Sequence, residues 1–171
     1  MQNQQLEHRH HQPSEKRFSL CLLVHDLESP QNVGSLFRLA DALGLEKIYL
    51  SGSSPKPPNK KITRTSRSTE KYVEFEYIAS ALDVITRLRA DDYLIIALEI
   101  AENSINLHDL DIQADAKICL MLGTENFGIS AELMKQANIV VHIPMQGNNS
   151  SMNVSHACAI ASYVLTQKLT R

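Results

Sequence analysis

The residues best suited to bind a small molecule form a polar run at positions 148–153, Asn-Asn-Ser-Ser-Met-Asn. Almost every side chain in this run can donate or accept a hydrogen bond, and an amphipathic segment follows directly. A second polar run, Thr-Glu-Asn at 124–126, follows Gly123 and an apolar segment, and Phe127 and Gly128 come after it. In sheets flanked by helices, ligands bind where such turns gather at the strand ends. We therefore interpret both runs as parts of a binding site.

Arg38 is a further residue with a possible functional role. An apolar stripe at helical spacing runs through residues 33–43, and Arg38 falls on the opposite face, near Gly34 and Asp41. A glycine in the first turn of a helix costs about 1 kcal/mol relative to alanine, so Gly34 indicates a close approach to the backbone there. From these residues alone, two interpretations stay open for Arg38: a surface ion pair with Asp41, and a functional group.

The stretch from Gly52 to Lys71 is polar and reads as a loop that contains several prolines. Its second half is rich in cations interleaved with threonine and serine, a composition that suits contacts with nucleic-acid phosphates. A solvated loop is the alternative interpretation. The cations are Lys60, Lys61, Arg64, Arg67 and Lys71.

Other kinds of catalytic site find little support. The chain has no G-x-G-x-x-G after its first strand, no phosphate-binding loop motif and no H-E-x-x-H. Ser150 and Ser151 lie outside any G-x-S-x-G, so a serine nucleophile is not indicated. The cysteines have no C-x-x-C spacing, and we interpret them as reduced thiols of the core rather than metal ligands. They are Cys21, Cys119 and Cys158.

The elements that must position these residues alternate between strands and helices. Ser29 and Pro30 predict the start of a helix that Gly44 ends. A less regular stretch at 99–116 has a possible short element around Leu107. The order predicts an α/β domain with a mostly parallel sheet flanked by helices. Expected strands span 19–25, 47–50, 72–75, 93–98, 118–122 and 139–143, and further helices span 79–88, a segment after Ser130, and 153–169.

Composition places the chain among ordinary globular proteins. At 171 residues, with 43% apolar and 21% charged residues, it predicts one domain at 18–171 after a disordered tail at 1–17. The net charge of −2 argues against a protein that coats nucleic acid, although a local basic patch could still bind RNA. The sequence contains neither an apolar run of about 18 residues nor the apolar core of a signal peptide, so we expect a cytoplasmic protein without a membrane span.

Three separated segments together resemble a known set of motifs. They read N-V-G-S-L-F-R at 32–38, L-G-T-E-N-F-G-I-S at 122–130 and I-P-M-Q-G-N-N-S-S-M-N-V-S at 143–155. In order and spacing they resemble the three motifs of the SpoU/TrmH family of RNA ribose 2′-O-methyltransferases, within the SPOUT superfamily. The resemblance covers nearly the whole chain from Phe18 onward. It implies a deep C-terminal trefoil knot that binds S-adenosylmethionine, a homodimer through the C-terminal helix, and tRNA or rRNA as substrate.

The resemblance also assigns roles to individual residues. Cofactor contacts, largely through the main chain, would come from Leu98, Gly123, Ile143 and Met152. Met152 stands where the family commonly has leucine, and an apolar side chain of similar volume can pack under an adenine. The segment at 64–69 differs from the small-residue sequence often found there in the family. The catalytic positions would be Asn32 and Arg38 in the first motif, Glu125 with Asn126 in the second, and Ser151 and Asn153 in the third.

These residue types agree with methyl transfer to a sugar. A ribose hydroxyl must lose its proton while it attacks the methyl carbon. The pKa of arginine lies above about 12, which makes it a poor base. We therefore expect Arg38 to orient the ribose or its phosphate and to stabilise developing alkoxide charge, with a base role as the alternative. Glu125 is expected to fix Arg38 or its own loop, and Lys60, Lys61, Arg64 and Arg67 to bind RNA.

Two other functions are compatible with parts of the pattern. A non-catalytic RNA-binding or cofactor-sensing module could keep the same fold, although Arg38, Asn32 and Asn153 speak against it. A generic α/β enzyme acting on a small molecule would show neither RNA affinity nor salt-dependent binding.

Overall fold

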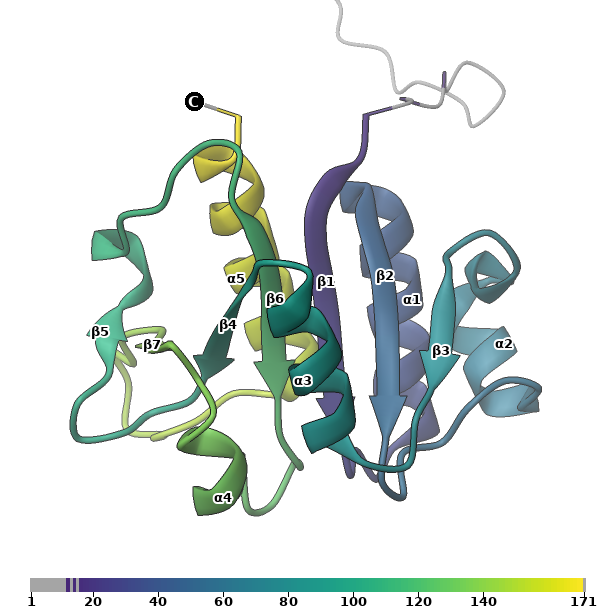
Figure 1. Cartoon of the computed structure of the whole chain (residues 1–171). Coiled ribbons are helices and arrows are strands. Elements are labelled where there is room, and N and C mark those ends of the chain that lie inside the picture. The colour runs from purple at the N-terminus through teal and green to yellow at the C-terminus, as the bar shows by residue number, and fades with distance from the viewer. Residues whose placement is uncertain (1–11, 13, 15, 171) are drawn as a thin grey trace, which may run out of the picture.

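The computed structural model describes residues 12, 14 and 16–170 (Figure 1). The disordered tail predicted at 1–17 lies for the most part outside these residues. The core of the described part is a seven-stranded sheet in the order β3-β2-β1-β6-β4-β7-β5, and every named pair is parallel. The predicted α/β class is therefore confirmed. The strands are β1 Phe18–His25, β2 Leu45–Ser51, β3 Phe75–Tyr77, β4 Tyr93–Leu98, β5 Ile105–Asn106, β6 Lys117–Leu122 and β7 Ile139–His142.

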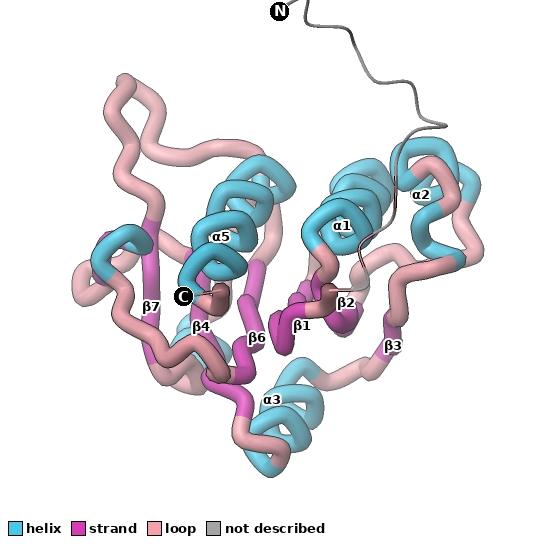
Figure 2. The backbone as a smooth tube through the Cα atoms, turned by 90° about the horizontal axis from the view of Figure 1, so that it is seen from above, coloured by secondary structure: helices cyan, strands magenta, loops and turns pink. Residues whose placement is uncertain are grey.

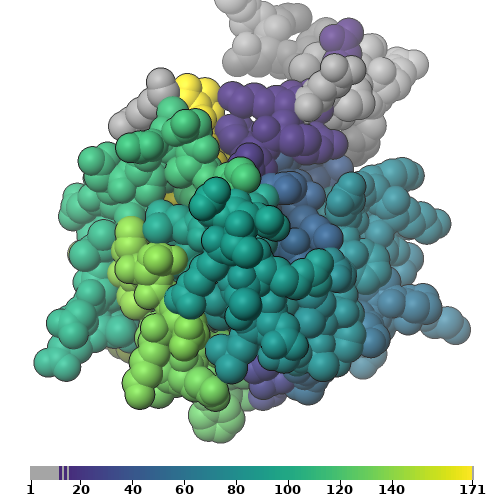
Figure 3. Space-filling view, viewed as in Figure 1, coloured from purple at the N-terminus to yellow at the C-terminus, as the bar shows by residue number. Residues whose placement is uncertain are grey.

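Helices cover both faces of the sheet. Figure 2 shows α1 and α5 on one side of the strands and α3 on the other. In the space-filling view of Figure 3, side chains of the segment that contains α3 cover much of the sheet on the facing side. The helices are α1 Pro30–Leu43, α2 Lys60–Ser66, α3 Ala81–Ala90, α4 Ala131–Met134 and α5 Val154–Lys168, with 3₁₀ turns η2 Thr69–Lys71 and η3 Leu107–Asp109.

Alternate residues of β1 pack into the two different layers. Leu20, Leu22 and Val24 belong to the core shared with α1 and α5, whereas Cys21 and Leu23 belong to the core shared with α3. Successive side chains of a strand point to opposite faces, so a strand covered on both sides is apolar throughout. The continuous apolar run predicted this arrangement correctly.

The helix predicted from the first motif is α1. The Ser29 side chain accepts a hydrogen bond from the N–H of Asn32, Pro30 is the first helical residue, and Gly44 closes the helix in the left-handed conformation at φ 67°. Arg38 is exposed, as the projection predicted. Between Arg38 and Asp41, both in the described part of the chain, no ion pair forms.

The segment predicted as a loop at 52–71 contains α2 and the turn η2, so that prediction was wrong in part. The Asn59 side chain caps α2 by accepting from the N–H groups of Lys61 and Ile62. Ile62 is fully buried and anchors the helix to α1. A Cβ built on Gly34 would lie 2.7 Å from the Ile62 carbonyl oxygen and 2.8 Å from the Thr65 Cβ. The close approach inferred from Gly34 is therefore the approach of α2.

One strand was placed too early. The strand predicted at 72–75 is observed at Phe75–Tyr77. Tyr72 instead follows the turn η2 as its C-terminal cap and is 76% exposed. The following helix starts at Ala81, capped by Ser80, two residues later than predicted. The remaining predicted strands and helices start and end within one or two residues of those observed, except that the segment after Ser130 forms only the short α4.

Along α5, the apolar face differs from the predicted one. Ala161 and Leu165 are buried as predicted, but Val154, Ala157 and Val164 are only half-buried. Cys158, Ser162 and Thr166 take the remaining fully buried positions on this helix.

The cysteines are free and buried, which confirms their interpretation as core thiols. Among the described residues, no helix is long and apolar enough to cross a membrane. The trefoil knot implied by the resemblance stays a prediction.

Candidate active site

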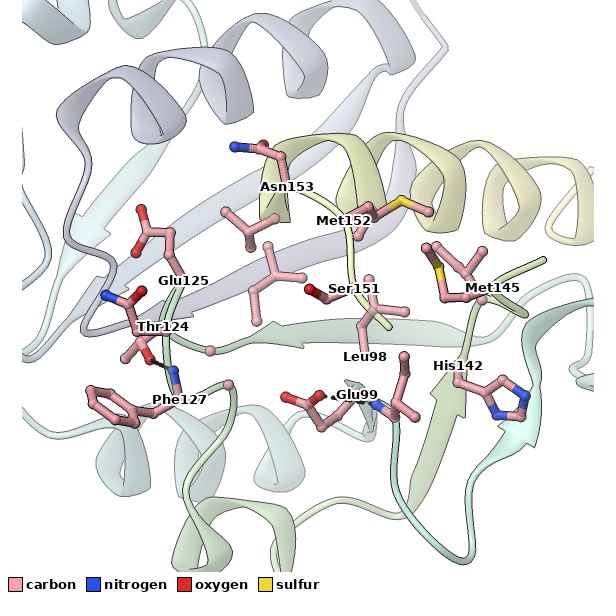
Figure 4. Close-up of a pocket in the computed structure, with 18 residues that line it drawn as sticks. Leu98, Glu99, Thr124, Glu125, Phe127, His142, Met145, Ser151, Met152 and Asn153 are labelled. Carbon is pink, nitrogen blue, oxygen red and sulfur yellow. Dashed lines mark hydrogen bonds between the residues drawn. The ribbon is translucent and has the colours of Figure 1, made fainter. Parts of the chain in front are cut away.

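A cavity of about 350 Å³ opens at the carboxyl-terminal edge of the sheet (Figure 4). Its walls come from the ends of β4, β6 and β7 and from the start of α5. Small-molecule sites in proteins commonly occupy about 300–1,000 Å³. The predicted cofactor residues Leu98, Gly123, Ile143 and Met152 all line the cavity, together with Glu125, Ser151 and Asn153.

The floor of the cavity is a tight turn after β6. The N–H of Thr124 donates to the carbonyl of Gly128 over 3.0 Å, and the N–H of Gly128 donates back to Thr124 over 3.1 Å. Gly128 has a φ of +66°, which favours glycine. A Cβ on Gly123 would lie 2.1 Å from the carbonyl carbon of Gly128, so no larger residue fits without opening the turn.

Glu125 ties this turn to the start of α1. Its carboxylate accepts hydrogen bonds from the backbone N–H of Glu28 at 2.8 Å and of Ser29 at 3.0 Å. It also accepts from the Asn32 side-chain amide at 2.8 Å. Carboxylates are favourable at helix N-termini because the first N–H groups lack intrahelical partners. Glu125 thus contacts the entry to α1 and Asn32, and not Arg38.

These contacts set the charge state of Glu125. Partial burial works to raise the pKa of this carboxyl group, but the hydrogen bonds from the Glu28 backbone, the Asn32 side chain and the Ser29 backbone together lower the pKa below its ordinary value. Glu125 is therefore ionised at neutral pH.

Asn32 also joins the first motif to the third. Its side-chain oxygen accepts from the Asn153 amide nitrogen at 3.1 Å. The Asn153 side-chain oxygen in turn accepts from the backbone N–H and the hydroxyl of Ser155. Asn153 thereby caps the N-terminus of α5. A chain of side-chain hydrogen bonds, Glu125–Asn32–Asn153, connects three segments that lie far apart in sequence. We call it the amide chain.

Arg38 and the predicted RNA-binding residues lie outside the cavity lining. Arg38 is exposed on α1, one helical turn beyond Gly34, where α1 touches α2. Sequence reasoning brought it together with the polar turns, but the structure does not bring it into the cavity wall. The cations Lys60, Lys61, Arg64 and Arg67 are all exposed, on α2 and at its C-terminal cap.

Two carboxylates at the site were missed from the sequence. The Glu99 side chain accepts from the N–H of Ile129 and from that of Ile100, both at 3.0 Å, and so links the end of β4 to the turn after β6. The Glu28 carboxylate accepts from the Asn126 amide at 3.1 Å. Their only signal was position: Glu99 directly follows a strand end, and Glu28 precedes the helix cap.

The sequence of this chain is similar to those of known RNA methyltransferases. Residues 19–163 match the SpoU rRNA Methylase family. A tRNA (guanosine(18)-2′-O)-methyltransferase of Borreliella burgdorferi is 32% identical over 153 residues, which cover 89% of this chain and 68% of that protein. A putative TrmH family tRNA/rRNA methyltransferase of Staphylococcus saprophyticus is 26% identical over 157 residues, or 92% of this chain and 62% of that protein.

The fold agrees with a solved relative. The crystal structure of an AdoMet-bound rRNA methyltransferase from Sinorhizobium meliloti superposes with a TM-score of 0.81 at 25% identity. The superposition covers 94% of this chain and 60% of that one. The chain therefore spans about three fifths to two thirds of the length of these relatives.

Proposed function

Because the chain belongs to the SpoU rRNA methylase family, we propose that it transfers a methyl group from S-adenosylmethionine to a ribose 2′-hydroxyl of tRNA or rRNA. The observation that carries the proposal is the amide chain. It joins one residue from each of the three motifs beside a single cavity at the sheet edge. The three motifs identified in the sequence thus meet at one place in the fold, as a shared active site requires.

The cavity suits the proposed cofactor. Leu98, Ile143 and Met152 give it apolar walls for an adenine ring, and Gly123 lines it at the start of the turn after β6. S-adenosylmethionine, when bound, supplies a methyl group activated by a sulfonium. The protein would hold it largely through the main chain, with Met152 as the apolar contact under the base.

The catalytic roles that we propose are those implied by the family resemblance. Asn32, Ser151 and Asn153 would hold the acceptor ribose, and Glu125 would keep Asn32 and the turn after β6 in register. Arg38 would act on the ribose or its phosphate from the exposed side of α1 and stabilise the alkoxide that forms as the hydroxyl loses its proton. A role for Arg38 as the base is the alternative.

RNA would bind along α2 and the adjoining part of α1. Support comes from the exposure of Lys60, Lys61, Arg64 and Arg67 on a helix that packs against α1. Such cations neutralise phosphates without reading sequence. Substrate choice between tRNA and rRNA would then depend on the shape of the RNA.

We further propose a cytoplasmic homodimer through α5. Support comes from Ile160 and Tyr163, which are 41% and 57% exposed and lie three residues apart, and thus on one side of the helix. A partner copy would cover this apolar surface.

Two measurements test the function. Titration calorimetry with S-adenosylmethionine measures cofactor binding, and labelled methyl transfer to bulk tRNA and rRNA measures catalysis. We expect both. Cofactor binding without transfer to any RNA would instead support the non-catalytic module. Absence of RNA affinity would support a small-molecule enzyme. Mapping of methylated riboses in RNA from cells that lack the gene would then identify the nucleotide.

A further inference from the structure

Phe127 is the most exposed large apolar side chain in the described part of the protein. Its relative exposure is 88%, against 76% for Tyr72 and 57% for Tyr163. Single exposed apolar residues are ordinary on protein surfaces, so exposure alone means little. Phe127 and Ile100, which is 55% exposed, both line the cavity, whereas Tyr72 and Tyr163 do not, and of the two lining residues only Phe127 is aromatic. Its phenyl ring also has no polar atom to be hydrated, unlike tyrosine.

The backbone holds Phe127 in a fixed position. Its N–H donates to the Thr124 hydroxyl at 2.9 Å, inside a turn closed by reciprocal hydrogen bonds between Thr124 and Gly128. Glu99 braces the far side of the same turn through the N–H of Ile129. The side chain next to Phe127, Asn126, is held by the Glu28 carboxylate. The ring is therefore presented by a braced turn and not by a loose loop.

The ring lies at one particular end of the cavity. Figure 4 shows Phe127 at the same end as Thr124 and Glu125, away from Met145 and His142. Glu125, at this end, accepts a hydrogen bond from Asn32, which is one of the residues proposed to hold the acceptor ribose. Met152, the apolar contact proposed for the adenine, lies farther from Phe127, toward Met145.

From these observations we propose that Phe127 stacks on a nucleobase of the RNA, at or next to the nucleotide whose ribose is methylated. The inference rests on the proposed function and adds to it the state of the substrate: an unpaired base, accessible on its flat face. A base inside a duplex stacks on its neighbours and offers no free face. The protein therefore selects loops, bulges or single-stranded segments.

Three substitutions separate stacking from general apolar contact. Phe127→Ala should raise the KM for RNA at least about fivefold, the lower end of the usual loss for a stacking aromatic, with a smaller change in kcat. Phe127→Tyr should restore the wild-type KM, because the ring is kept. Phe127→Leu should behave like the alanine variant. Calorimetry should give the same affinity for S-adenosylmethionine in all variants. Ile105→Ala, at an apolar residue that is 42% exposed on β5, is the matched control and should leave KM unchanged.

A direct reading of the contact is available because the chain contains no tryptophan. Phe127→Trp introduces a single indole at the proposed contact, and Ile105→Trp introduces one on β5 as a control. Addition of unmodified tRNA transcripts, or of rRNA fragments, should quench the fluorescence of Trp at 127 and leave that of the control variant unchanged. Addition of S-adenosylmethionine alone should not quench either.

Several results would overturn the proposal. Equal KM values for Phe127→Ala and the wild type would do so, as would full rescue by Phe127→Leu. A change of oligomeric state in Phe127→Ala, measured by sedimentation, would assign the ring to a second copy of the chain instead. If the wild type binds RNA but transfers no methyl group, the proposed function fails, while the fluorescence comparison still decides whether Phe127 touches a base.

Discussion

Glu125 shows how much one side chain can organise. It accepts from two backbone N–H groups at the start of α1 and from Asn32. We expect Glu125→Ala to lower the free energy of unfolding by about 1 kcal/mol at neutral pH, since several hydrogen bonds to a charged acceptor are lost and their exposure limits the effect. Urea denaturation measures the change. Glu102→Ala, at an exposed carboxylate, is the control.

The same substitution has a predictable dependence on pH. Because the folded protein lowers the pKa of Glu125 below its ordinary value of 4.5, its contribution is present in full above pH 4.5 and is lost as the pH falls through the lower folded pKa. The difference in unfolding free energy between Glu125→Ala and the wild type should therefore be constant from neutral pH down to 4.5 and shrink below it. A difference that grew on acidification would contradict this sign.

Substitution of Arg38 tests whether cofactor binding and methyl transfer can be separated. It lies outside the cavity wall, so Arg38→Ala should leave the affinity for S-adenosylmethionine within a few-fold while methyl transfer is abolished. Arg38→Lys keeps the charge but loses the planar fork, and we expect it to recover only part of the activity. Calorimetry and labelled transfer measure the two effects. Arg89→Ala, on α3 in the other helical layer, is the control, and a fully active Arg38→Ala would refute the role.

At the scale of elements, α1 was predictable and α2 was not. The signals for α1 are local: Ser29 caps it, Pro30 opens it and Gly44 ends it. The helix α2 has only one fully buried apolar residue, Ile62, within a polar and proline-containing stretch, so no periodic stripe marks it. Its formation depends on packing against α1, which a local pattern does not encode.

Gly34 tests that packing. Alanine normally favours a helix over glycine by about 1 kcal/mol, but here its Cβ would lie 2.7 Å from a backbone oxygen of α2. We therefore expect Gly34→Ala to lower the free energy of unfolding by about 1 kcal/mol or more, as overpacked sites commonly do. Denaturation midpoints measure this. Gly147→Ala, with open space around the new methyl group, should be close to neutral.

The exposed cations of α2 give a test of the proposed RNA-binding surface. The double variant Lys61→Glu, Arg64→Glu should weaken RNA binding and make its salt dependence less steep, because fewer counterions are released from the phosphates. Binding of S-adenosylmethionine should not change. Affinity measured by filter binding across a salt series gives both quantities. Lys117→Glu, at the start of β6 and thus at the other end of the strands, is the control. An unchanged salt slope would place the RNA elsewhere.

At the scale of the whole molecule, the thiols report on the core. Cys21 and Cys119 face each other on the paired central strands β1 and β6, and Cys158 lies within α5. Burial raises the pKa of Cys158 to about 12, and the neighbouring Cys119 thiol together with burial raises the pKa of Cys21. We expect none of them to react with a disulfide reagent in the native protein and all to react in urea. Fast native reaction at neutral pH would contradict the described core.

The site as a whole could be predicted only through the order and spacing of its motifs. Each motif follows a strand or opens a helix that local patterns predicted, so the cavity edge was foreseeable from the parallel sheet. The hydrogen-bond partners of Glu125 could not be predicted. They are the backbone N–H groups of Glu28 and Ser29, and every residue except proline has such a group, so the sequence does not indicate which ones Glu125 binds. The position of Arg38 outside the cavity wall could not be predicted either, because it depends on how α1 packs in the folded protein.

The amide chain also has a consequence for how the protein is made. Asn32 meets Glu125 across 93 positions and Asn153 across 121. While a ribosome is still adding the middle of the polypeptide, the first motif has already emerged but its partners have not been translated. The hydrogen bonds that join the three motifs can therefore form only near the end of translation, and a product that terminates before Asn153 should lack them.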